Sequence, residues 1–325
     1  MLSGSANPMT TAFIFPGQGS QAVGMGKALS EAYPAAARTF AEVDEALGQP
    51  LSRLMFDGPE AELMLTANAQ PALMAVSVAA LRVLEAEAGL DLKQAAAYLA
   101  GHSLGEYSAL AAADSVPVAE AARLLRIRGD AMQAAVPVGQ GAMAALIGIE
   151  PDAAAAIAAE AAGRDVCGVA NDNGGGQVVL SGSAAAVNRA IAIAKARGVK
   201  RAVLLSVSAP FHCALMRPAA DAMAEALGKV EVADPAVPVV ANVLARPVDA
   251  AAEVVNCLVG QVCGTVRWRE SIAWMTEAGV TRFVEVGSGK VLSGLVKRIA
   301  PTATTAAVGT PDDVAAFIEA ATGAV

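Results

Sequence analysis

The residues Gly101, Ser103 and Gly105 form a G-x-S-x-G pattern, which is typical of a nucleophile elbow. In such an elbow a strand turns sharply into a helix, and the central serine adopts a strained backbone conformation that exposes its hydroxyl. The apolar run at 94–101 is typical of a buried strand, and the run that begins at Glu106 contains good helix formers. Strand, turn and helix therefore follow in the order that a catalytic serine requires, although an ordinary turn fits the same five residues.

A serine nucleophile needs a base, and the chain has two histidines. His102 is next to Ser103 on a tight turn, where a neighbouring side chain usually points away, so a structural role suits it better. His212 lies in a Pro-containing loop after a predicted strand, and we take it as the base, with a capping or packing role as the alternative. No nearby acidic residue stands out as its orienting partner, and a backbone or amide carbonyl can serve instead.

Two other segments carry groups that could contact a ligand. A glycine-rich loop at 16–21 follows a strand-like run at 11–15 and precedes a predicted helix at 25–29. This loop lacks the spacing of a phosphate-binding loop, so it either offers backbone NH groups to a nearby site or is a plain turn. Arg123, Arg126 and Arg128 lie on a predicted helix at 118–136. Helical arginines are most often solvated or paired, so a ligand role for one of them stays an alternative.

The remaining pattern predicts an α/β protein of two parts. Between 143 and 207 the elements follow the order β-α-β-β-α-β, the ferredoxin-like split pattern, with strands at 143–149, 166–170, 177–181 and 201–207 and helices at 151–162 and 184–197. We expect residues 139–207 to form a small subdomain inserted into a large α/β domain made of 9–138 and 208–325, with a mostly parallel sheet and a cleft between the parts. In the large domain we expect helices at 35–47, 61–65, 70–88 and 217–227, with Pro71 in a first turn, and strands at 238–242 and 281–286.

Composition bounds the functional class. The 325 residues are 55% hydrophobic, and a formal net charge of -8 argues against general affinity for nucleic acid or an anionic membrane. Four cysteines without a C-x-x-C pair favour reduced thiols in the cytoplasm rather than a zinc site. Residues 1–8 lack signal-peptide features and are read as a tag or short extension. The apolar stretch 71–84 is interrupted at Arg82 and is too short to span a bilayer.

Four motifs, in this order and spacing, resemble those of the bacterial malonyl-CoA:acyl carrier protein transacylases. They are Phe15–Gln21, Gly101–Glu106, Arg128-Gly129 with Met132-Gln133, and His212–Met216. The similarity runs from about Thr10 to the C-terminal region. It implies the same architecture as the pattern of elements does, a hydrolase-like α/β domain with a ferredoxin-like insertion.

The resemblance also implies a role for individual residues. Ser103 would be the nucleophile and His212 the base, and the backbone NH groups of Gln18 and Leu104 would form the oxyanion hole. Arg128 would hold the free carboxylate of a malonyl group, because a guanidinium can bind both oxygens. Gln261 matches the residue whose carbonyl orients the histidine, although the segment 262–268 departs from the Asn-Pro that the family has before its Val-x-Trp.

The activity implied is transfer of malonyl from malonyl-CoA to acyl carrier protein for fatty acid synthesis, without metal or cofactor, by a cytoplasmic monomer. Acidic carrier protein would dock on a local basic surface, for which the candidates are Lys195, Arg197, Lys200, Arg201 and Lys290. An acyltransferase of polyketide synthesis or malonate decarboxylation would use the same site, so these stay as alternatives. A serine esterase or thioesterase fits less well because of Arg128 and the inserted subdomain. A non-catalytic scaffold fits less well because it leaves the serine, the histidine, the arginine and the two loops that carry NH groups unexplained.

Overall fold

The computed structural model describes residues 10–322, with side chains to residue 320, so the extension predicted at 1–8 lies outside the described residues. The larger sheet has the strand order β10-β9-β1-β2-β7-β8. Its strands are β1 (Thr10–Phe15), β2 (Tyr98–Gly101), β7 (Val239–Ala241), β8 (Arg246–Val248), β9 (Val280–Val286) and β10 (Thr304–Val308). Neighbouring strands are parallel except for β7 and β8. The prediction of a mostly parallel sheet is confirmed.

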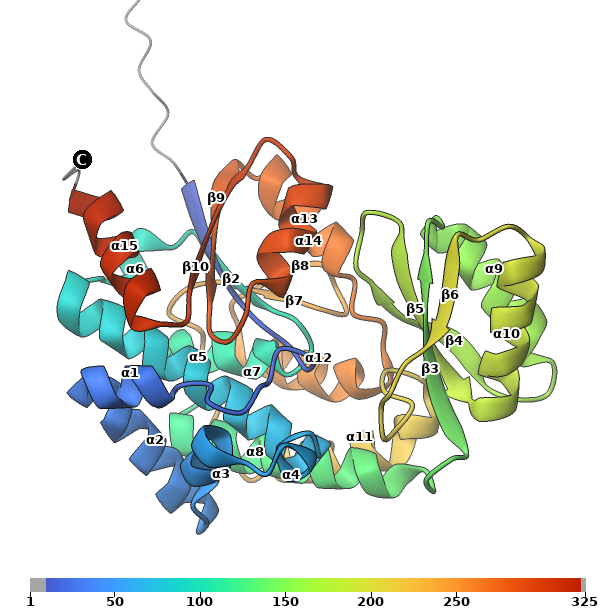
Figure 1. Ribbon diagram of the computed structural model, residues 1–325, viewed down its shortest axis with the longest axis horizontal. Coiled ribbons are helices and arrows are strands. Elements are labelled where there is room, and N and C mark those ends of the chain that lie inside the picture. Colours follow the sequence, from blue (N-terminus) through green and yellow to red (C-terminus); the bar gives the residue numbers. More distant parts are fainter. Residues whose placement is uncertain (1–9, 323–325) are drawn as a thin grey trace, which may run out of the picture.

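Helices cover both faces of this sheet (Figure 1). Side chains of β1 alternate, so that Phe13 and Phe15 enter one helical layer while Ala12 and Ile14 enter the other. The first layer comprises α1 (Lys27–Ala32), α2 (Pro34–Leu47), α3 (Leu51–Asp57), α4 (Glu60–Leu63), α5 (Thr66–Ala88), α6 (Leu92–Ala95), α7 (Gly105–Ala112), α8 (Val118–Ala135), α11 (Arg217–Leu227), α12 (Ala251–Cys263) and α15 (Pro311–Thr322). The second layer comprises α13 (Trp268–Glu277) and α14 (Val291–Ile299). Burial on both faces explains the uninterrupted apolar runs at 12–15 in β1 and 98–101 in β2.

A second, antiparallel sheet lies beside the large one, at the right of Figure 1. Its strand order is β4-β5-β3-β6, and two helices pack on it around a separate core. The elements are β3 (Gly141–Ile147), α9 (Pro151–Ala162), β4 (Cys167–Asp172), β5 (Gln177–Ser183), α10 (Ala184–Ala196) and β6 (Arg201–Leu204). This is the ferredoxin-like arrangement that the sequence predicts. The domain boundaries at 139 and 207 stay a prediction.

Several helix boundaries differ from those expected. The helix expected at 25–29 begins at Lys27, after Gly26 in a left-handed conformation. The helix expected at 70–88 begins at Thr66, so Pro71 lies inside α5 and not in its first turn. Proline there removes one helical hydrogen bond, a local cost that is offset by the burial of most of α5, Pro71 included. A further helix, α3, lies between the helices expected at 35–47 and 61–65, and the sequence pattern missed it.

Helix α5 is longer than the apolar stretch suggested. The expectation was made for the stretch 71–84 alone, whereas the whole helix of 23 residues is, by length and composition, long and apolar enough to cross a bilayer. However, 83% of its most apolar window is buried inside the protein, as in a core helix. Among the described residues it is the one helix that meets these length and composition criteria.

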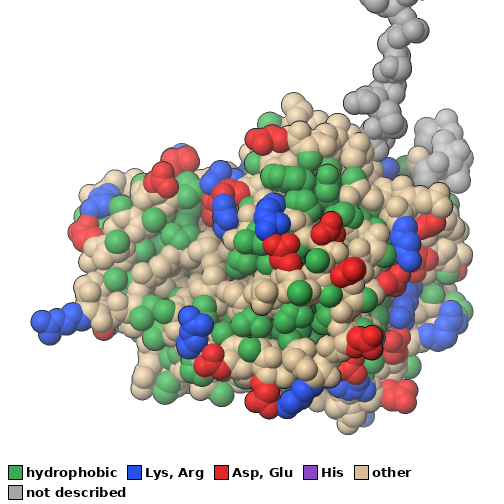
Figure 2. Space-filling view, turned by 180° about the vertical axis from the view of Figure 1, so that it is seen from behind, with side chains coloured by type: hydrophobic (Ala, Val, Ile, Leu, Met, Phe, Trp, Pro, Cys, Tyr) green, Lys and Arg blue, Asp and Glu red, His purple; other side chains and the backbone are tan. Residues whose placement is uncertain are grey.

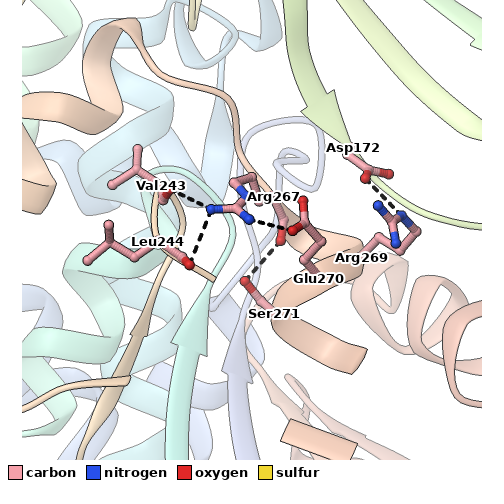
Figure 3. A network of polar contacts seen from close by, with 7 residues as sticks. All are labelled: Asp172, Val243, Leu244, Arg267, Arg269, Glu270 and Ser271. Carbon is pink, nitrogen blue, oxygen red and sulfur yellow. Dashed lines mark hydrogen bonds and ion pairs between the residues drawn. The ribbon is translucent and has the colours of Figure 1, made fainter. Parts of the chain in front are cut away.

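The N-terminus of α13 anchors the small sheet to the large one (Figure 3). Arg269 on α13 pairs with the buried carboxylate of Asp172 on β4 at 2.8 Å. Arg267 donates to the carbonyls of Val243 and Leu244 and pairs with Glu270, which fixes the same segment on the β7–β8 turn. The position of the small sheet is therefore coupled to the segment that follows α12.

The surface carries charges of both signs. On the face opposite to that of Figure 1, acidic and basic side chains are interspersed rather than segregated (Figure 2). Elsewhere in the described part of the chain, exposed charges form ion pairs such as Lys229 with Glu225 and Arg189 with Asp165. Such pairs contribute little to stability individually. On this face, therefore, charges of neither sign gather into one broad surface.

Candidate active site

Ser103 lies at the turn between β2 and α7, as the sequence predicts. Its φ is +52°, a left-handed conformation that is strained for a serine. A Cβ on Gly101 would lie 1.9 Å from the backbone of Gly105, so the turn closes only because residue 101 is glycine. The serine is thereby placed one residue before the N-cap of α7, where a helix favours developing negative charge.

His212 contacts the serine from the loop that follows the small sheet. Its Nε2 lies 2.8 Å from Ser103 Oγ, and its Nδ1 donates to the carbonyl oxygen of Gln261 at 2.8 Å. The second bond leaves Nε2 free to accept the serine proton. Burial lowers the pKa of His212 to about 3, and the positive charge of Arg128 lowers it as well. The imidazole is consequently neutral near pH 7, the form that a base requires.

The glycine-rich loop lies directly against the elbow. A Cβ on Gly17 would lie 2.6 Å from the carbonyl oxygen of His102, so the loop approaches more closely than any residue with a side chain would allow. Gln18 lines the cleft beside Ser103, and its side chain accepts a hydrogen bond from Thr66 at 3.0 Å. Within residues 10–322 the backbone NH groups of Gln18 and Leu104 donate to no other protein atom. Neither NH group is therefore taken up by a protein acceptor, as the oxyanion-hole assignment requires.

Arg128 reaches the same point from α8. Its side chain is 2% exposed, and its Nη2 donates to Ser103 Oγ at 3.1 Å and to the side-chain oxygen of Gln261 at 2.9 Å. Nη1 donates to the side-chain oxygen of Gln70 at 2.7 Å, and Nε has no partner among the described residues. A buried guanidinium with neutral partners is costly. The site is therefore suited to a ligand that brings a carboxylate.

Arg123 and Arg126, the other candidates on α8, point elsewhere. Arg123 is exposed, pairs with Glu120 and donates to the carbonyl of Ala46. Arg126 donates to the side chain of Asn68. Among the three arginines, the structure thus brings Arg128 to Ser103 and leaves the other two away from it.

His102 faces the small sheet. Its Nε2 lies 2.9 Å from the side-chain oxygen of Asn173, and its ring packs on Trp268 at 5.6 Å. Burial lowers the pKa of this histidine too. The hydrogen-bonded arrangement matches the structural role expected for it.

Three site residues escaped sequence analysis. The side chain of Gln70 accepts a hydrogen bond from Arg128. The side chain of Asn242 accepts the backbone NH of Ser103 in the elbow, and Glu106 accepts the backbone NH of Asn242, which follows β7. Burial raises the pKa of Glu106 to about 7. Asn242 had one usable signal, its place at the carboxyl end of a predicted parallel strand, where functional groups gather.

A cleft of about 810 Å³ lies between the two sheets, and Gln18, Gln70 and His212 are among the residues that line it. Asn171, Asn173 and Gln177 line it from the small sheet, while Ser103 and Arg128 line it from the large part. The volume lies in the range of small-molecule and cofactor sites. Among the described residues, no group of three or more His, Cys, Asp or Glu side chains is arranged to hold a metal ion.

Comparisons with known proteins agree with this geometry. Residues 12–321 match the acyl transferase domain family. The chain is 47% identical over 308 residues to the malonyl CoA-acyl carrier protein transacylase of Escherichia coli K12, covering 95% of this chain and 98% of that protein. The crystal structure of the acyl-carrier-protein-S-malonyltransferase of Bartonella henselae superposes with a TM-score of 0.94 at 53% identity, covering 96% and 99% of the two chains. A malonyl-transacylase in complex with its type II PKS acyl carrier protein superposes with a TM-score of 0.92 at 43% identity, covering 96% and 99%.

Proposed function

The chain belongs to the acyl transferase domain family, among the malonyl CoA-acyl carrier protein transacylases, and on that premise we propose that it transfers malonyl from malonyl-CoA to acyl carrier protein through an acyl-serine intermediate. One observation carries the proposal for the site. The buried guanidinium of Arg128 donates to the hydroxyl of Ser103 at 3.1 Å, so a carboxylate bound by this arginine would lie next to the nucleophile.

In the first step His212 Nε2 accepts the hydroxyl proton of Ser103 while Oγ attacks the thioester carbon of malonyl-CoA. The backbone NH groups of Gln18 and Leu104 bind the oxygen that becomes negative in the tetrahedral intermediate. The intermediate collapses, the carbon–sulfur bond breaks, and the imidazolium returns the proton to the leaving sulfur of coenzyme A. The product is a malonyl ester on Ser103.

The second step runs in reverse with a different thiol. His212 accepts the proton of the phosphopantetheine thiol of acyl carrier protein, and the thiolate attacks the malonyl ester. The oxyanion forms at the same NH groups, and Ser103 Oγ leaves with the proton from the imidazolium. The carbonyl of Gln261 holds Nδ1–H throughout, which keeps Nε2 pointed at the exchanged proton.

Arg128 selects the acyl group. A malonyl carboxylate would replace Ser103 Oγ as an acceptor of Nη2 and pair with a guanidinium that otherwise has neutral partners. An acetyl group leaves the buried charge unpaired, which disfavours acetyl donors. This residue also favours transfer over the ordinary esterase alternative.

The imidazole and the two NH groups supply every proton and charge that these steps require, so the proposed reaction uses no metal or organic cofactor. We place the enzyme in the cytoplasm as a monomer. Carrier docking is assigned to the exposed side chains of Lys195, Lys200 and Arg201. Arg197 and Lys290 are weaker candidates, because each already forms an ion pair, with Glu160 and Asp313.

The test of the function is a transfer assay with a panel of donors and acceptors. Malonyl-CoA should be used far better than acetyl-CoA, and the thiol of holo acyl carrier protein far better than water. A carrier of fatty acid synthesis should be compared with carriers of polyketide synthesis and of malonate decarboxylation. Hydrolysis of malonyl-CoA at a rate similar to transfer would contradict the proposal and favour a thioesterase.

A further inference from the structure

Asn242 holds both sides of the nucleophile elbow. It follows β7 directly and is 1% exposed. Its side-chain oxygen accepts the backbone NH of Ser103 at 2.8 Å, and its side-chain nitrogen donates to the carbonyl of Gly101 at 2.7 Å. One amide therefore binds the residues before and at the turn, across a separation of about 140 positions in the chain.

Glu106 holds Asn242 in turn. The carboxylate is 2% exposed, and one of its oxygens accepts the backbone NH of Asn242 at 2.8 Å. The same oxygen accepts the side-chain NH of Gln261 at 3.0 Å, and that NH group also lies 3.0 Å from the carbonyl of Ser103. Both peptide groups of Ser103 are thus bound by side chains that Glu106 fixes.

We propose that Asn242, held in place by Glu106, is a positioning residue that sets the Oγ of Ser103 against His212 and Arg128. The inference rests on the proposed role of Ser103 as nucleophile. Ser103 has a φ of +52°, a conformation that persists only where the surroundings enforce it. Asn242 supplies that constraint on the nucleophile itself, while the close approach at Gly101 merely permits the turn.

The bond to Asn242 also decides which NH groups face the oxyanion. The NH of Ser103 points to Asn242 and is occupied. The NH groups of Leu104 and Gln18 are left for the substrate oxygen. Loss of Asn242 would let the peptide of Ser103 rotate, which displaces Oγ from its 2.8 Å contact with His212. A misplacement of about 1 Å can cost a catalytic step on the order of 100-fold in rate.

The experiment measures acylation by malonyl-CoA in rapid-quench bursts. For Asn242→Ala we expect a rate constant about 10- to 100-fold lower per competent site, with KM within a few-fold of the wild type. Asn242→Asp, which has the same volume, should fall similarly because its second oxygen would face the carbonyl of Gly101. The amplitude of the burst measures how many active sites are competent. A variant that folds less well therefore shows a smaller amplitude, while the acylation rate constant of its folded molecules is unchanged. Wild-type rate constants per site in both variants would overturn the proposal.

Glu106 provides a rescue test and Glu285 a control. Glu106→Ala should slow acylation at least 10-fold, and Glu106→Gln should recover most of that loss because its amide oxygen can still accept both NH groups. Glu285 on β9 is likewise buried and accepts the backbone NH groups of Leu292 and Ser293 at 3.0 and 2.7 Å. Glu285→Gln should leave the acylation rate constant unchanged. Equal slowing in Glu285→Gln and Glu106→Ala would show a general effect of buried carboxylates and contradict the assignment.

The outcome separates this inference from the function on which it rests. If Ser103 is not the nucleophile, the wild-type enzyme itself shows no burst of malonyl-serine. If Ser103 is the nucleophile and Asn242 does not position it, the wild-type burst appears and the Asn242 variants share its rate constant.

Discussion

Replacing His212 with alanine is expected to slow malonylation of Ser103 by about 10²- to 10⁴-fold, the usual contribution of a positioned general base. Nε2 lies 2.8 Å from Ser103 Oγ, and without it the hydroxyl proton has no acceptor during attack. Binding of malonyl-CoA should change little, because the carboxylate is held by Arg128 and not by the imidazole. Single-turnover mixing with radiolabelled malonyl-CoA measures the acylation rate directly.

The second histidine provides a matched control. His102 is adjacent to the nucleophile but faces Asn173 and Trp268. His102→Ala should therefore slow acylation far less than His212→Ala does. The assignment of the base fails if His212→Ala acylates within 10-fold of the wild-type rate. It also fails if His102→Ala slows acylation more than His212→Ala does.

Replacing Arg128 with alanine is expected to lower malonyl transfer by about 10²- to 10³-fold, since losing one partner of a buried charge pair costs roughly 2–5 kcal/mol. Acetyl transfer should fall far less, because an acetyl group makes no bond to the guanidinium. The measurement is kcat/KM for malonyl-CoA and acetyl-CoA with the same carrier, and the preference for malonyl should collapse.

A second effect of Arg128 acts in the same direction. Burial and the charge of Arg128 both lower the pKa of His212. A carboxylate on Arg128 offsets that charge, raises the pKa of the imidazole and strengthens the base. Malonyl donors thus improve the base when they bind, whereas acetyl donors do not. In Arg128→Ala the charge is gone for both donors, which further reduces the difference between them.

Arg123 on the same helix is the control for this variant. It is exposed and pairs with Glu120, so Arg123→Ala should retain the preference for malonyl. Equal losses of malonyl and acetyl transfer in Arg128→Ala would remove the carboxylate-binding role, and an equal collapse of selectivity in Arg123→Ala would point to a general defect of α8.

The elbow and the two parts of the fold, the large α/β part and the small sheet with its helices, could be predicted because they rest on local patterns. Gly101 and Gly105 flank the serine at fixed spacing, and the alternation of elements from 143 to 207 predicts the order of the small sheet. The association of Gln18, Arg128 and Gln261 with the serine came from a resemblance of motifs, and the structure brings all three to the cleft or to Ser103.

The contacts of Asn242 and Glu106 could not be predicted in the same way. They join β7 to an elbow about 140 residues earlier, and no local spacing encodes such a pairing. The start of α5 was missed for a related reason. Pro71 argues locally for a helix start, but tertiary burial of α5 extends the helix by another turn.

Intact-protein mass spectrometry after brief incubation with malonyl-CoA and acid quench tests the central claim most directly. We predict one malonyl group per chain, localised to Ser103 by peptide mapping, discharged on addition of holo acyl carrier protein, and absent from Ser103→Ala. An unchanged mass in protein that actively transfers malonyl, or an adduct that persists in Ser103→Ala, would contradict the account.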